Sequence, residues 1–199
     1  MRFGIFGGTF DPPHIGHLIL AAEAHDQLRL DKIIWILTPY PPHKKNQKIT
    51  GIMYREKMVL LAIDDNPFFE FSRVDIDRPS PHYAVDTMLL LRNQHPKDEL
   101  FYIMGLDSLN DLPTWHTPSD FIGLCNGIIV MVRQGEVLKD EQLFVAFAGL
   151  ENKIHYLATP IIEISGTDIR ARVYHGKQYR YLVPEKVYSF ISDNHLYQN

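Results

Sequence analysis

A chain of 199 residues with 45% hydrophobic residues can bury a core, and its formal net charge of −4 gives no overall attraction to nucleic acid or to an anionic membrane. The single cysteine, Cys125, excludes an internal disulfide, and no apolar run reaches the ~18 residues that a membrane span needs. We therefore expect a soluble cytoplasmic protein with one domain, residues 1–199, in which Cys125 is a small buried residue.

The first predicted unit is a strand, a turn and a helix start within residues 3–17, which read FGIFGGTFDPPHIGH. Its apolar run, 3–6, predicts a strand that breaks at the glycine pair. Glycines let backbone N–H groups approach a ligand, and a following helix N-terminus adds N–H groups and a positive dipole end, which suits a phosphate. His14 and His17 share a helix face and can present two imidazoles to one phosphate chain. The alternative is a glycine turn with two partly buried histidines bonded to backbone.

Hydrophobic periodicity gives the later elements in chain order. Apolar residues recur at helical spacing and predict helices at residues 18–28, 52–63, 83–91 and 184–196. Short apolar runs predict strands at residues 32–38, 68–74, 100–104 and 127–132, with an extended segment at 154–164. In the second helix we expect Arg55 on the polar side, with Glu56 and Lys57. Pro184 suits the first position of the last helix.

Strands that alternate with helices predict an α/β fold with a doubly wound, Rossmann-like parallel sheet and right-handed crossovers. A small C-terminal helical portion, about residues 165–199, follows the sheet. In such sheets ligands bind beyond the carboxyl ends of the strands, where the strand order reverses. The loops expected at those ends carry phosphate-binding residue types: Gly7-Gly8-Thr9, residues 39–44, residues 105–108, Arg133 and residues 165–170. Neither the dinucleotide fingerprint GxGxxG nor the Walker A pattern is present in the first turn.

Two motifs resemble the HxGH nucleotidyltransferase superfamily, GGTFDPPHIGH at 7–17 and ISGTDIR at 164–170. Within it the chain is similar to the nicotinate-nucleotide adenylyltransferases over nearly its whole length. Further motifs follow in the order of that family: PPHK at 41–44, Tyr54-Arg55, GLDS at 105–108, LPTWH at 112–116 and VRQG at 132–135.

The resemblance implies an enzyme that joins the AMP part of ATP to nicotinate mononucleotide, with Mg²⁺ present, giving nicotinate adenine dinucleotide and pyrophosphate in NAD biosynthesis. No protein side chain is expected to ligate the metal. An in-line attack on the α-phosphorus needs two anions aligned and the growing charge on pyrophosphate neutralised.

The resemblance also implies roles for particular residues. The catalytic residues would be His14, His17, Lys44 and Arg170. ATP or the dinucleotide would bind at Gly7, Gly8, Thr9, Phe10, Gly105, Asp107, Arg133, Ile164, Ser165 and Thr167. The pyridine ring and its carboxylate would meet Tyr83, Ala84, Trp115 and His116.

Some of these residues also have ordinary structural interpretations. Ser165 and Thr167 are expected to cap the helix that carries Arg170. Asp107 would bond a ribose hydroxyl or cap a short helix, and Trp115 would stack on the pyridine or anchor its loop.

Two other functions remain open at this stage. One is a related adenylyl- or cytidylyltransferase, such as phosphopantetheine adenylyltransferase, although such chains are typically shorter and lack LPTW. The other is a non-catalytic nucleotide-binding module. A homo-oligomer is also left open.

Overall fold

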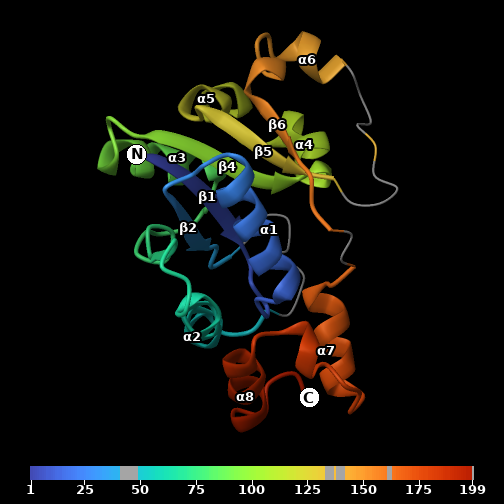
Figure 1. Ribbon diagram of the computed structural model, residues 1–199. Coiled ribbons are helices and arrows are strands. Elements are labelled where there is room, and N and C mark those ends of the chain that lie inside the picture. Colours follow the sequence, from blue (N-terminus) through green and yellow to red (C-terminus); the bar gives the residue numbers. More distant parts are fainter. Residues whose placement is uncertain (41–48, 133–136, 138–141, 161–162, 199) are drawn as a thin grey trace.

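A computed structural model describes residues 1–40, 49–132, 137, 142–160 and 163–198. Its centre is one parallel sheet with helices on both faces (Figure 1). The strands are β1 (Arg2–Gly8), β2 (Lys32–Leu37), β3 (Phe69–Ser72), β4 (Glu99–Gly105), β5 (Gly127–Met131) and β6 (Ile154–Leu157). The helices are α1 (Ile15–Gln27), α2 (Ile52–Ile63), α3 (Ala84–Gln94), α4 (Leu106–Asp111), α5 (Pro118–Leu124), α6 (Gln142–Ala146), α7 (Gly166–Tyr174) and α8 (Glu185–Asp193). The 3-10 turns in the described residues are η2 (Leu112–Thr114), η3 (Glu151–Lys153) and η4 (Arg180–Leu182).

The strand order confirms the doubly wound sheet. The strands lie in the order β3-β2-β1-β4-β5-β6, and every adjacent pair is parallel. The chain moves outward from β1 to β3 and then returns to β4 on the other side of β1. This reversal puts the switch point of the sheet at the carboxyl ends of β1 and β4, and in folds of this kind ligands bind in a crevice beyond those ends.

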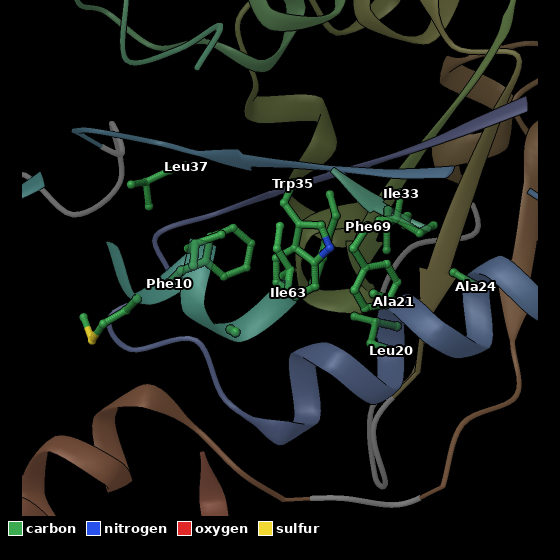
Figure 2. Close-up of a cluster of buried hydrophobic side chains, with 14 of the residues drawn as sticks. Phe10, Leu20, Ala21, Ala24, Ile33, Trp35, Leu37, Ile63 and Phe69 are labelled. Carbon is green, nitrogen blue, oxygen red and sulfur yellow. The ribbon is translucent and has the colours of Figure 1, made fainter. Parts of the chain in front are cut away.

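Each face of the sheet has its own apolar core, because side chains alternate along a strand. In β2, Ile33 and Trp35 point to one face, whereas Ile34 and Ile36 point to the other. The first core lies under α1 and α2, and Figure 2 shows Trp35 at its centre. The second core lies under α3, α4 and α5.

The C-terminal helices pack into the first core. Ile169 of α7 is fully buried there, together with Val187 and Ile191 of α8. Leu196, beyond α8, is 9% exposed and belongs to the same cluster. The end of the described chain is therefore tied by apolar contacts to the same side of the sheet as α1 and α2.

The structure corrects several predicted boundaries of strands and helices. β1 continues through the glycine pair to Gly8, because β2 offers paired backbone up to Leu37. Helix α1 begins at Ile15, which confirms the helix start predicted within residues 3–17, whereas apolar residues at helical spacing begin only at residue 18. The extended segment 154–164 yields only the four-residue β6. Pro184 is the N-cap of α8, not its first residue, and its carbonyl accepts from the N–H of Tyr188.

The prediction that Arg55 lies on the polar side of α2 was also wrong. Its side chain is 2% exposed, and its guanidinium donates to four backbone carbonyls. The acceptors are the oxygens of Thr50 at 2.7 Å, Thr9 and Thr38 at 3.0 Å, and Pro39 at 2.8 Å. Burial lowers the pKa of Arg55. One buried cation thus fastens the chain after β1 and after β2 to the start of α2.

We predict that Arg55→Lys lowers the free energy of unfolding by about 3 kcal/mol, because one ammonium cannot satisfy all four buried carbonyls. Denaturant unfolding followed by circular dichroism measures the change. Arg172→Lys is the matched control, since Arg172 is 40% exposed and pairs with Asp168 one turn earlier on α7. That change is expected to cost only about 0.5 kcal/mol. Equal losses in the two variants would contradict the role given to Arg55.

Candidate active site

Two histidines lie together at the N-terminus of α1. His14 is the N-cap residue and is 6% exposed, and the half-buried His17 is the third residue of the helix. Their rings stack with centroids 3.6 Å apart and an interplanar angle of 26°. The backbone N–H of His14 donates to Nδ1 of His17 at 3.2 Å. Neutral His17 therefore carries its proton on Nε2, where it can donate to an anion.

Gly16, between the two histidines, leaves room for their stacking. A Cβ at this position would lie 3.1 Å from Nδ1 of His14 and 3.3 Å from its Cε1. These distances are tighter than ordinary van der Waals contact, so a larger residue would push the His14 ring aside. The spacing HxGH thus has a steric reason in this chain as well as a chemical one.

Arg170 brings the second motif against the first. Its Nη1 donates to the backbone oxygen of Asp11 at 2.7 Å, and its Nη2 donates to Oγ1 of Thr167 at 3.2 Å. A Cβ on Gly166 would lie 2.8 Å from the same Asp11 oxygen. Only glycine therefore lets the start of α7 approach the loop that leads to His14.

The N-terminus of α7 is capped as Ser165 predicts. The Ser165 side chain accepts from the N–H of Asp168 at 3.1 Å. Thr167 was also expected to cap the helix, but it lies inside the first turn and accepts from Arg170 instead. Ile164, just before the cap, is half-buried and packs against the first core. The free N–H groups of this helix start add to the donors near Arg170.

The loop after β1 contributes backbone more than side chains. Gly7 and Gly8 end the strand, and the carbonyl of Thr9 accepts from Arg55. The ring of Phe10 is 2% exposed and packs in the first core, so a ligand can meet only its backbone. A Cβ on Gly8 would lie 2.8 Å from that ring. Phe10 has a φ of 46°, which turns the chain back toward α1.

The predicted pyridine-binding residues come from two loops that meet. Tyr83 is the N-cap of α3 and Ala84 is its first residue. The Tyr83 ring stacks on His116 with centroids 4.3 Å apart and an interplanar angle of 27°. Trp115 is half-buried, with the ring of Phe121 5.1 Å away. Its packing shows the loop anchor, and the stacking role stays a prediction.

Asp107 does not cap α4. The N-cap residue is Gly105, at the end of β4, and Asp107 is the second residue of the helix. Its carboxylate accepts from the N–H of Ser108 at 2.8 Å. A Cβ on Gly105 would collide with this carboxylate, so glycine lets Asp107 lie over the strand end. The exposed carboxylate remains a candidate ligand for a ribose hydroxyl.

Two predicted phosphate ligands, Lys44 and Arg133, lie outside the described residues. Within the described ranges, no group of three or more His, Cys, Asp or Glu residues could hold a metal ion. The same ranges contain no helix with the length and apolar character needed to cross a bilayer. Cys125 is buried as expected, and burial raises the pKa of its thiol to about 12.

Sequence reasoning missed a network around the Asp11 carboxylate, which is 7% exposed. The hydroxyl of Tyr197 donates to Oδ1 at 2.7 Å, and the N–H of Thr50 donates to Oδ2 at 3.1 Å. The motif letters place Asp11 in the phosphate loop, but nothing in the local sequence pairs it with residues so distant in the chain. The buried Arg55 was missed in the same way.

Comparisons with known proteins agree with this geometry. The cytidylyltransferase-like family profile matches residues 5–172. A probable nicotinate-nucleotide adenylyltransferase of Thermomicrobium roseum is 41% identical over 99% of this chain and 92% of its own length. The nicotinate-nucleotide adenylyltransferase of Bacillus subtilis is 36% identical over 100% of this chain and 99% of its own.

Solved structures share the fold. A nicotinic acid mononucleotide adenylyltransferase of Plasmodium falciparum, complexed with NaAD, superposes with a TM-score of 0.79. The alignment covers 98% of this chain and 97% of that chain, at 16% sequence identity. A likeness at this identity supports the architecture and leaves the chemistry to the site residues.

The hydrogen bond to Nδ1 of His17 predicts the effect of two substitutions. His17→Asn places an amide oxygen near the Nδ1 position, so the N–H of His14 keeps an acceptor. His17→Leu removes that acceptor, and we expect it to cost about 1 kcal/mol more of unfolding free energy than His17→Asn. Denaturant unfolding of the two variants measures the difference. If the leucine variant is as stable as the asparagine variant, the hydrogen bond does not stabilise the start of α1.

Proposed function

Because this chain belongs to the nicotinate-nucleotide adenylyltransferase family, we propose that it transfers the adenylyl group of ATP to nicotinate mononucleotide at the crevice between β1 and β4. The products are nicotinate adenine dinucleotide and pyrophosphate, a step of NAD biosynthesis. One observation carries the assignment of the site. Arg170 of the second motif donates to the backbone oxygen of Asp11 in the first motif, so both motifs lie at one place.

The reaction needs few groups and no covalent intermediate. A 5′-phosphate oxygen of nicotinate mononucleotide attacks the α-phosphorus of ATP, and the bond to the β-phosphate oxygen breaks as pyrophosphate leaves. In our proposal His14 and His17 donate to the α-phosphate oxygens as charge develops there. Arg170 and the N-terminus of α7 bind the phosphates that leave. Gly8 and Thr9 offer backbone N–H groups beside them.

We propose that Mg²⁺ enters as part of the substrate, bound to the triphosphate of ATP. The groups proposed to face the phosphates are imidazole, guanidinium and backbone N–H donors, which suit phosphate oxygens and not Mg²⁺, a cation that prefers oxygen ligands. The metal would be held by phosphate oxygens and would neutralise charge on the leaving pyrophosphate. Lys44 and Arg133 are proposed as further phosphate ligands, and the Asp107 carboxylate as a ribose ligand.

The proposed pyridine pocket lies between the loop before α3 and the loop after η2. The Tyr83–His116 stack holds these loops together, and Trp115 is fixed by the second core. In the proposal the Trp115 ring stacks on the pyridine. Backbone N–H groups of Ala84 and His116 receive the nicotinate carboxylate. An amide substrate would set its own N–H donors against them, so the acid is preferred.

We also propose that the enzyme works in the cytoplasm, because its substrate ATP is made and used there. The lone buried cysteine is compatible with a reducing compartment. On this proposal residues 1–199 act as one nucleotidyltransferase domain, with the C-terminal helices as part of it.

We predict turnover in a pyrophosphate-release assay with ATP, Mg²⁺ and nicotinate mononucleotide. For nicotinamide mononucleotide kcat/KM should be lower by a factor of about ten or more, because its amide leaves the backbone N–H donors of the pocket unpaired. Phosphopantetheine should give no pyrophosphate, and a chelator should stop the reaction. Equal rates with acid and amide would contradict the pocket while leaving adenylyl transfer intact. If none of the three substrates gives pyrophosphate, the result contradicts the proposed activity and favours a non-catalytic nucleotide-binding module.

His17→Asn should separate catalysis from folding. The variant keeps an acceptor for the His14 N–H and loses the Nε2 donor, so kcat should fall about 100-fold or more. His175→Asn is the control, because His175 is exposed at the C-cap of α7. Steady-state kinetics of both variants, at a temperature where both are folded, tests the role. A His17→Asn enzyme with the kcat of the control would show that His17 does not act on the phosphates.

A further inference from the structure

The chain beyond α8 returns to the phosphate loop through an unusual turn. His195 and Tyr197 have φ values of 50° and 63°, a left-handed conformation that non-glycine residues adopt rarely. The N–H of Leu196 donates to the carbonyl of Ile191 at 3.0 Å, and the Leu196 side chain is buried. A backbone in this conformation persists where surrounding contacts determine it. The turn aims the Tyr197 side chain into the molecule instead of into solvent.

The hydroxyl of Tyr197 ends on a buried carboxylate. It donates to Oδ1 of Asp11 at 2.7 Å. Sδ of Met58, on α2, lies 3.9 Å from the same hydroxyl oxygen. Burial, together with the charge of Asp11, raises the pKa of Tyr197, so the phenol keeps its proton and remains a donor. The other carboxylate oxygen is taken by the N–H of Thr50. Two segments therefore fix the orientation of the Asp11 side chain.

The backbone oxygen of Asp11 contacts a different residue from its carboxylate. Its carbonyl oxygen accepts from Nη1 of Arg170, and Gly166 packs against the same oxygen with no space for a Cβ. A shift of Asp11 must therefore move the Arg170 guanidinium or break its hydrogen bond. Asp11 also lies three residues before His14, so the same shift would reach the start of α1. The contacts form one path, from the Tyr197 hydroxyl through Asp11 to Arg170.

We propose that Tyr197 is a positioning residue for adenylyl transfer. It touches no reacting atom, but its hydroxyl holds Asp11 so that Arg170 faces the phosphates in the geometry that the transition state needs. This inference rests on the proposed function. A misplacement of a catalytic group by less than a bond length lowers the rate of an aligned reaction severalfold or more.

Tyr197→Phe tests the proposal by removing one oxygen atom and no packing. We expect kcat for pyrophosphate release to fall about tenfold, with KM for nicotinate mononucleotide changed by less than about twofold. Tyr181→Phe is the matched control, because Tyr181 is 87% exposed and should leave both constants unchanged. The assays are run at a temperature at which circular dichroism shows that every variant is folded. A Tyr197→Phe enzyme with wild-type kcat, or with an apparent kcat that returns to the wild-type value once corrected for the folded fraction, would overturn the proposal.

A second background tests whether Tyr197 acts through Asp11. In an Asp11→Ala enzyme the hydroxyl has lost its carboxylate acceptor and can no longer act on Asp11, so adding Tyr197→Phe should lower kcat no further. Multiplicative effects of the two substitutions would overturn the path. If Asp11→Ala does not fold, the change in kcat and KM of the single Tyr197→Phe variant decides. Wild-type enzyme is assayed in parallel: absence of turnover there contradicts the proposed function, whereas wild-type turnover with no effect of Tyr197→Phe contradicts only this inference.

Discussion

The candidate site depends on one buried cation. The guanidinium of Arg55 reaches backbone oxygens that follow β1, follow β2 and precede α2, and it holds these three segments at fixed distances. A buried guanidinium is tolerated only when its donors are satisfied, so the carbonyls and the cation require one another. The nearby charge of Asp11 favours the charged form of Arg55 against burial. The path of the loop from Gly8 to His14 follows from this constraint, and with it the place where phosphates can bind.

The sheet could be predicted from the sequence because its strands are apolar on both faces. The run predicted at 32–38 is β2, Lys32–Leu37, whose alternate residues enter the two cores. Periodicity alone was insufficient at residues that do not pack in a core. It missed the end of β1, whose final residues are glycines, and the start of α1 was predicted from its histidine motif, since Gly16 and His17 carry no helical apolar pattern. Periodicity reports what a residue packs against, so it is silent where a backbone faces a ligand.

The motifs of the histidines, Ser165 and Arg170 could be found in the sequence, and the structure brings them together. The buried position of Arg55 could not be predicted, although Tyr54-Arg55 is one of the family motifs, since a charged residue on an amphipathic helix has the same pattern whether solvent or carbonyls surround it. Tyr197 was missed for another reason: its partner, Asp11, is 186 residues away, and no local signal links them. For Trp115 the motif gave two interpretations: the structure packs the ring against the second core, as a loop anchor does, and stacking on a ligand stays a prediction. Contacts between distant segments are the part of the site that sequence patterns do not contain.

The contact between Arg170 and Asp11 joins residues 159 positions apart, and Gly166 closes against the same carbonyl. Contacts of such long separation have to close a long loop before they add stability, so we expect them to form after the strands have paired. A folding intermediate with β1, β2 and β4 already paired would thus have a sheet but no assembled phosphate site. Such an intermediate would bind nucleotide poorly, whereas ATP that binds the native state stabilises it relative to the intermediate. The cellular ATP pool would then favour the completed chain over its partly folded forms.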